Sequence, residues 1–321
     1  MVNRDKTGYT TVNGRFEPDE KTVRDVKTGL TWCRDAAVSA FPLTWREAFE
    51  FIESLNNDRY AGFSDWRLPN RRELFSIVSH SHINPSLPPD HPFLNVFQGY
   101  YWSANTCARL PDQAWYVHFG GAKVYRGMKH ASNMVWPVRG VVNETSGVYC
   151  TGQRLCHDAA GNQFPCGEND MQHRALVSGI VWPSPRFVLS GDVAADRLTG
   201  LSWTRKASRE NRFFTWPEAL VEIDRMNREK RFGCNNWRMP EIREIETLAD
   251  LGSHSPALPM DHPFHDVSDF YWSGTTSMYE KRYAWAFYMK DGAVGVGFKE
   301  NAEFSLWPVR GLKFGTDNGT G

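Results

Sequence analysis

Apolar residues recur at helical spacing in two stretches of the chain that lie 171 residues apart. A capping box opens each stretch, at 44–47 and at 215–218. The apolar positions that follow are three or four residues apart, which places them on one face of a helix. The pattern therefore predicts two amphipathic helices with matching apolar faces. Their members are Trp45, Ala48, Phe49, Ile52 and Leu55, and then Trp216, Ala219, Leu220, Ile223 and Met226.

Other elements surround the two helices in the same order. A turn with a central Asp and Gly, at 25–32 and at 196–203, predicts a hairpin ahead of each helix. A second, shorter helix is expected after Pro69 and after Pro240, followed by a proline-rich loop. Short strands complete each stretch. We expect them at 100–103, 114–119 and 135–141, and again at 270–273, 284–289 and 306–312.

The order of elements and the tryptophans both indicate an internal duplication. Twelve of the thirteen tryptophans form pairs that are 170 or 171 residues apart, and only Trp182 has no counterpart. We expect an α+β fold in two tandem domains, each with two helices and a small, mainly antiparallel sheet. The expected segments are an N-terminal extension at 1–15, the first copy at 16–142, a cysteine-containing connector at 143–186, the second copy at 187–315 and a tail at 316–321.

Composition narrows the class of protein. The 37 basic and 37 acidic residues cancel, so nucleic acid and anionic membranes are not expected as the main partners. No run approaches 18 apolar residues, and we expect no membrane-spanning helix. The first twenty residues lack the apolar core of a signal peptide. The chain is therefore expected to be either cytosolic or a mature form whose leader has been removed.

The repeated motifs resemble those of the Lcl C-terminal domain family, a bacterial family of largely unassigned function named from the Legionella collagen-like adhesin. The matching pattern is Asp-x-x-Thr-Gly-Leu-x-Trp, Thr-Trp-x-Glu-Ala, Trp-Arg-Leu-Pro-Asn-x-Arg-Glu-Leu, His-Pro-Phe, Tyr-Trp-Ser and Trp-Pro-Val-Arg-Gly. The second copy departs from it at Met239, Glu241 and Ile245. The matched positions are 25–32, 44–48, 66–74, 85–93, 101–103 and 136–140, and then 196–203, 215–219, 237–245, 256–264, 271–273 and 307–311.

The resemblance implies a C-type-lectin-like fold for each copy. It also implies an extracellular or envelope setting, so the chain is expected to be secreted, periplasmic or on the cell surface. It carries over no enzyme activity, and no catalytic residue is predicted. The connector is similar to the segment that joins repeats in this family, with Cys156 and Cys166 around a short polar stretch. In an oxidising compartment we expect these two cysteines to form a disulfide.

Several repeated residues are expected to serve the fold. Arg72 with Glu73, and Arg139 near the last strand, could form a charged site, but a buried Arg–carboxylate pair between the second helix and the last strand is favoured. Trp66 opens the motif that precedes this helix and is expected in the core. The counterparts with the same expected roles are Trp237, Arg243, Glu244 and Arg310.

Residues of the late segments, which differ between the copies, are the candidate ligand-binding residues. Aromatic rings there would stack on a sugar, and basic groups would pair with its sulfate or carboxylate. For the tryptophans among them, core and surface positions both remain open. The candidates are Trp115, Tyr125, Arg126, Lys129, His130, Tyr283, Trp285 and Lys299.

No metal site is predicted. Asp90 with His91, and Asp261 with His262, supply two ligands per copy, too few for zinc or calcium, and Asp before His-Pro also forms turns. No cofactor is expected, although calcium stays open because lectin-like folds often bind it. The pairing of the other four cysteines is left open.

The sequence favours a non-enzymatic, exported protein that binds a glycan or a surface protein, or mediates adhesion. The alternative is a structural subunit of a surface layer, filament or envelope complex, with self-assembly. A third hypothesis is that the chain is an oxidative enzyme similar to formylglycine-generating enzymes, which use a cysteine pair. Cys33 and Cys107 would then have to meet, and the second copy has no cysteines at the matching positions.

Overall fold

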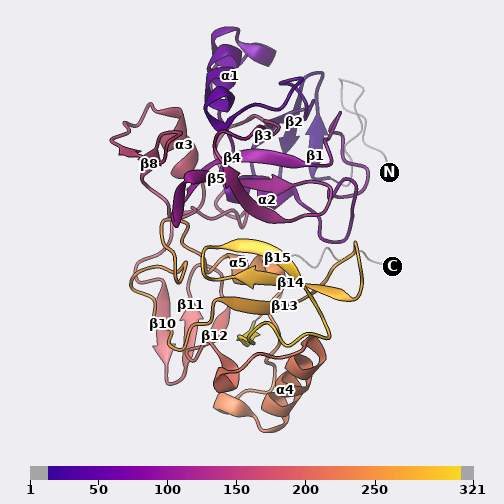
Figure 1. Ribbon diagram of the computed structural model, residues 1–321, viewed down its shortest axis with the longest axis vertical. Coiled ribbons are helices and arrows are strands. Elements are labelled where there is room, and N and C mark those ends of the chain that lie inside the picture. The colour runs from indigo at the N-terminus through magenta and orange to yellow at the C-terminus, as the bar shows by residue number, and fades with distance from the viewer. Residues whose placement is uncertain (1–13, 312–321) are drawn as a thin grey trace. The chain divides into compact units, whose positions relative to one another are not determined.

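A computed structural model describes residues 14–311 of the chain, which divides between Val181 and Trp182 into two compact units (Figure 1). Most of the predicted N-terminal extension, the whole of the tail and the end of the second copy lie outside the described residues. The two units are described separately below.

The first unit contains an antiparallel sheet in which the earliest and latest strands of the copy meet. Its order is β1-β2-β3-β7, so the hairpin that opens the copy pairs with the strand that closes it. A longer strand, β5, pairs with β4 on one side and with β6 on the other. The bounds are β1 Phe16–Pro18, β2 Thr22–Asp25, β3 Thr31–Cys33, β4 Tyr100–Cys107, β5 Leu110–His118, β6 Val124–Met128 and β7 Val138–Arg139.

The second unit repeats this plan. One sheet has the order β10-β11-β12-β16, and β14 pairs with β13 and β15. The bounds are β10 Phe187–Ser190, β11 Val193–Asp196, β12 Ser202–Thr204, β13 Phe270–Thr276, β14 Tyr283–Tyr288, β15 Ala293–Phe298 and β16 Val309–Arg310.

Each unit has the two predicted helices. The capping boxes at Thr44 and Thr215 are formed, with each threonine side chain accepting from the backbone of the glutamate three residues on. Among the described residues no helix is long and apolar enough to cross a membrane. The helices are α1 Trp45–Asn57, η1 Tyr60–Gly62 and α2 Arg71–Ile77, and then η2 Arg209–Asn211, α4 Trp216–Arg228, η3 Arg231–Gly233 and α5 Ile242–Glu246.

The paired tryptophans connect distant segments inside each unit. Trp102 donates its indole N–H to the carbonyl of Leu43 at 2.9 Å, and its counterpart Trp272 donates to Phe214 at 2.8 Å. Buried indoles need such an acceptor, because an unpaired N–H in the core costs free energy. Four of the six tryptophan pairs donate to corresponding carbonyls in the two units. The other matching pairs of donors are Trp45 and Trp216, Trp66 and Trp237, and Trp136 and Trp307.

The charged pair of the first unit joins the repeated motif to the second helix. The Arg67 guanidinium donates two hydrogen bonds of 2.6 Å to the Glu73 carboxylate, which is fully buried. Glu73 also accepts from the Asn70 backbone at 2.8 Å and from the Ser178 hydroxyl at 2.6 Å. The backbone of Arg67 is bonded in turn to Val138 of β7. The second unit repeats the pair with Arg238 and Glu244, again with two 2.6 Å bonds.

This arrangement corrects the expected pairing. The arginine that binds Glu73 is Arg67 of the repeated motif, and not Arg139 of the last strand. Arg72 instead donates to the backbone carbonyl of Cys150. Arg139 pairs with Asp65, at 2.6 Å. In the second unit Arg243 is half-buried and Arg310 lies in the last strand, β16.

The segment expected as a separate connector belongs mostly to the first unit. Residues 143–181 carry a short hairpin and a helix, and the predicted disulfide between Cys156 and Cys166 is present, with a Cα–Cα distance of 6.0 Å. The segment packs on the first copy because its polar side chains hydrogen bond there; Gln153, for example, accepts from the Thr106 backbone at 3.0 Å. The elements are β8 Cys156–His157, β9 Gln163–Phe164 and α3 Met171–Leu176.

Replacing Arg67 with methionine should leave the Glu73 carboxylate buried without its counter-charge. We expect R67M to lower the free energy of unfolding by about 3–5 kcal/mol, measured by urea denaturation followed by tryptophan fluorescence. R238M should cost less, because the Arg238 side chain is 19% exposed against 5% for Arg67. The control is R46M, which breaks a solvent-exposed pair with Glu50 and should cost less than about 1 kcal/mol. Equal effects of R67M and R46M would contradict this account.

Candidate functional site

An aromatic cluster covers part of one sheet face in the first unit. In the register of the strands Tyr100 lies opposite His118, and Tyr116 lies opposite Tyr125. Because side chains alternate along a strand, all four residues share one face. The ring of Tyr100 is 4.4 Å from that of Tyr116 and 4.7 Å from that of His118. Tyr100 and Tyr125 are 42% and 44% exposed, so the cluster is accessible to a ligand.

Glycine and histidine geometry helps to hold this aromatic cluster in place. A Cβ on Gly127 of β6 would lie 2.8 Å from the Tyr116 ring, so only glycine leaves room for that ring to lie flat there. The Nδ1 atom of His118 accepts from the Gly121 backbone at 2.9 Å, which leaves the proton on Nε2 in the neutral ring. Burial, with a contribution from the Lys123 charge, lowers the pKa of His118. The environment of His118 therefore favours the neutral imidazole.

Partial burial also favours the neutral form of Tyr116. Burial raises the pKa of Tyr116 to about 12, and the neighbouring Tyr100 and Tyr125 add to the shift. A neutral phenol can both donate and accept a hydrogen bond. The cluster thus offers ring faces together with hydroxyl groups, which is the combination that a polyhydroxylated ligand requires.

The second unit repeats this aromatic cluster only in part. The register places Ala286 and Gly295 where the first unit has Tyr116 and Tyr125. The ring of the buried Phe304 packs against the ring of Trp272, with centroids 4.4 Å apart, so part of the hydrophobic core occupies the adjoining space. Phe270 and Tyr288 take the positions of Tyr100 and His118, with ring centroids 5.2 Å apart, so the second unit lacks the counterparts of Tyr116 and Tyr125.

The two tryptophans among the predicted ligand-binding residues are buried. Trp115 is fully buried, and the guanidinium of Arg71 lies 4.8 Å from its ring centroid. Trp285 is 3% exposed. Strand alternation explains the result for Trp115, because it points to the face opposite Tyr116. Neither ring has an accessible face on which a sugar could stack.

The two predicted lysines contact the protein itself. Lys129 is 1% exposed, donates to the backbone carbonyl of Asp158 at 2.6 Å and lies 4.0 Å from the ring centroid of Trp45. Lys299 takes the matching position over Trp216, at 4.3 Å, and donates to the Thr276 hydroxyl. Burial lowers the pKa of both lysines. Both side chains are held by packing rather than free for a ligand.

The remaining predicted residues are divided between the units. Tyr125 belongs to the aromatic cluster, and the Arg126 guanidinium lies 4.8 Å from its ring centroid. His130 is exposed, beyond the end of β6. Tyr283 packs against Phe298 at 5.4 Å, in the second unit. Of the predicted ligand-binding residues, only Tyr125 lies in the cluster, because Arg126 is opposite Trp115 in the register and therefore belongs to the other face of the sheet.

Tyr100, Tyr116 and His118 are not among the predicted ligand-binding residues, because the sequence does not predict β6 as a strand. With Val124–Met128 as a strand, Tyr125 pairs with Tyr116 and completes the cluster. The alternation of residues along the strand could have indicated this face. Tyr116 and His118 are two residues apart, and the residues that alternate with them are apolar.

No described residues form a recognisable metal centre. Among residues 14–311 no group of three or more His, Cys, Asp or Glu side chains is placed to hold a metal ion. In the proline-rich loops the Nδ1 atom of His262 accepts from the Phe264 backbone at 3.2 Å, and His91 lies beside Phe93. Cys33 and Cys107 are both buried, and they lie on β3 and β4, which belong to different sheets.

Comparison with known proteins gives one family. The family profile described as the Lcl C-terminal domain matches the chain twice, over residues 21–139 and 192–310. The two matches agree with the two copies of the repeated motifs. No curated protein matches the chain.

The buried Lys129 predicts a pH dependence of stability. Burial lowers its pKa from 10.5 to about 8. Between these values the folded chain has lost a proton that the unfolded chain still binds, so the free energy of unfolding rises with pH. Relative to K129M, the wild type should gain about 1–3 kcal/mol from pH 7.5 to pH 10. Urea denaturation of both proteins across this range measures the difference, and a pH-independent difference would contradict the prediction.

Proposed function

Because this chain belongs to the Lcl C-terminal domain family and carries that domain twice, we propose that it is an exported, non-enzymatic binding protein of the adhesin type. Its first domain binds a glycan through the aromatic cluster of Tyr100, Tyr116, His118 and Tyr125. The setting is the cell surface, the periplasm or the extracellular medium. The C-type-lectin-like fold is part of this proposal. It is supported by the pairing of β3 with β7 and by the two helices that follow the first sheet.

The observation that carries the proposal is the exposed aromatic cluster. Sugars present C–H groups on one face and hydroxyls at the edge, and they pack on aromatic rings that also supply polar groups. Tyr100 and Tyr125 leave more than two fifths of their surface to solvent, although large aromatic side chains are usually buried.

The cysteines support a binding role over an oxidative one. Burial, with the nearby Asp35 charge, raises the pKa of Cys33 well above its ordinary value. A cysteine nucleophile needs the thiolate, which such an environment disfavours. Neither a cofactor nor calcium enters the proposal.

Removing the rings of the cluster should weaken glycan binding without unfolding the domain. We expect Y100A and Y116A each to weaken binding to the glycan selected on an array by about tenfold, or 1.4 kcal/mol. Isothermal titration calorimetry measures the change. Y125F should retain the stacking surface and lose only the contribution of the hydroxyl. The matched control is Y279A in the second domain, where Tyr279 is 72% exposed and lies outside the cluster.

Two results would overturn the proposal. One is an array on which the native protein binds no glycan. The other is equal binding by Y100A, Y116A and the wild type, with thermal unfolding showing that the variants are folded. Ordered assemblies in size-exclusion chromatography and negative-stain images, without glycan binding, would instead favour a structural subunit of a surface layer, filament or envelope complex.

A further inference from the structure

A pocket in the second domain contains an arginine that has lost the partner found in the first domain. In the first domain Arg139 donates to Asp65 at 2.6 Å, and its guanidinium lies 3.7 Å from the Phe63 ring centroid. The corresponding arginine, 171 residues later, is Arg310. The residues that correspond to Asp65 and Phe63 are Asn236 and Cys234. Both groups that held the first arginine are therefore missing from the second domain.

Among residues 14–311, no acceptor is hydrogen bonded to the Arg310 side chain, and no carboxylate is paired with it. Its Nε atom is shielded from solvent and lacks a partner there. The nearest recorded ring is that of Trp237, with a centroid 5.8 Å away. A shielded guanidinium N–H without an acceptor is costly, and a bound anion would relieve that cost.

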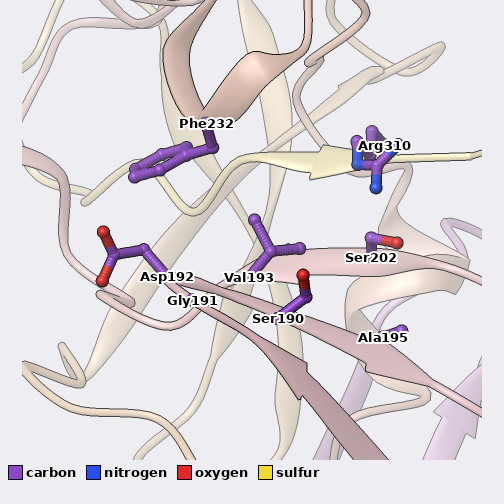
Figure 2. A pocket seen from close by; sticks show the side chains of 8 residues that line it. All are labelled: Ser190, Gly191, Asp192, Val193, Ala195, Ser202, Phe232 and Arg310. Atoms are coloured by element: carbon purple, nitrogen blue, oxygen red, sulfur yellow. The ribbon is translucent and has the colours of Figure 1, made fainter.

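Arg310 lines a pocket of about 370 Å³ that also has an apolar wall. Figure 2 shows Arg310 beside Ser202 at one end, Asp192 and Phe232 at the other end, and Val193 between them. Phe232 is 37% exposed, so its ring is available to the apolar part of a ligand. The negative charge of Asp192 disfavours a second anionic group on the same ligand.

We propose that this pocket binds a small monocarboxylate with an apolar or ring-shaped body. Its carboxylate accepts hydrogen bonds from the Arg310 guanidinium, as the Asp65 carboxylate does from Arg139 in the first domain. The planar guanidinium suits a carboxylate because both groups can form two parallel hydrogen bonds. The body of the ligand lies against Phe232, and the Ser190 and Ser202 hydroxyls are available to polar substituents. This site lies in the second domain and does not depend on glycan binding by the first.

The test uses sodium benzoate as the probe, with benzamide as its neutral isostere. Titration of the full chain, followed by NMR signals of the Arg310 Nε–H group and of the benzoate ring, should show saturable binding of benzoate and none of benzamide. R310Q should weaken benzoate binding at least about tenfold. F232A should weaken it less, because it removes only the apolar contact.

A second variant, N236D, keeps the test decisive if R310Q disturbs the fold. It restores the carboxylate of the first domain, so it should fill the site, abolish benzoate binding and raise the thermal unfolding temperature. The matched control is D65N, which breaks the pair with Arg139 in the first domain and should leave benzoate binding unchanged. The proposal is overturned if benzoate does not bind, if benzamide binds equally well, or if folded R310Q and N236D bind benzoate like the wild type.

Discussion

Each domain depends on a buried ion pair between an arginine of the repeated motif and the third residue of the short helix that follows. In the first domain the Glu73 carboxylate receives two bonds from Arg67, one from the Asn70 backbone and one from Ser178. Burial of a charge is tolerated only when it is paired and its remaining lone pairs are satisfied, and this carboxylate meets both conditions. The pair fixes the start of α2 and, through the backbone of Arg67, its position against β7.

The duplicated residues thus form a common framework, and the positions that differ carry the candidate chemistry. Tryptophan side chains bond to the same backbone carbonyls in both domains, and the Arg–Glu pair is formed twice. The first domain places tyrosines where the second has Ala286 and Gly295. The second has Asn236 where the first has Asp65. A shared framework with different surfaces is consistent with two binding sites of different chemistry on one chain.

The composition of the connector predicted its disulfide but not its packing on the first domain. Its glycine, asparagine and cysteine content predicts a loop with a disulfide, and the disulfide between Cys156 and Cys166 is present. The same polar composition gave no sign that residues 143–181 would pack on the first domain. That packing rests on side-chain hydrogen bonds between residues far apart in sequence, such as those of Gln153 with Thr106. Local composition contains no information about such partners.

The duplication, the fold class, the family, the helices and the core positions of Trp66 and Trp237 could all be predicted from the amino-acid sequence. These follow from local signals: capping boxes, helical periodicity and motifs repeated at a fixed interval. Tertiary structure alone decided which arginine binds Glu73, which face of β5 is buried and which tyrosines form a cluster. Alternation places Tyr116 and Trp115 on opposite faces of β5, but which neighbours share each face depends on how the strands pair. The tertiary structure also shows that no carboxylate among the described residues is paired with the Arg310 side chain.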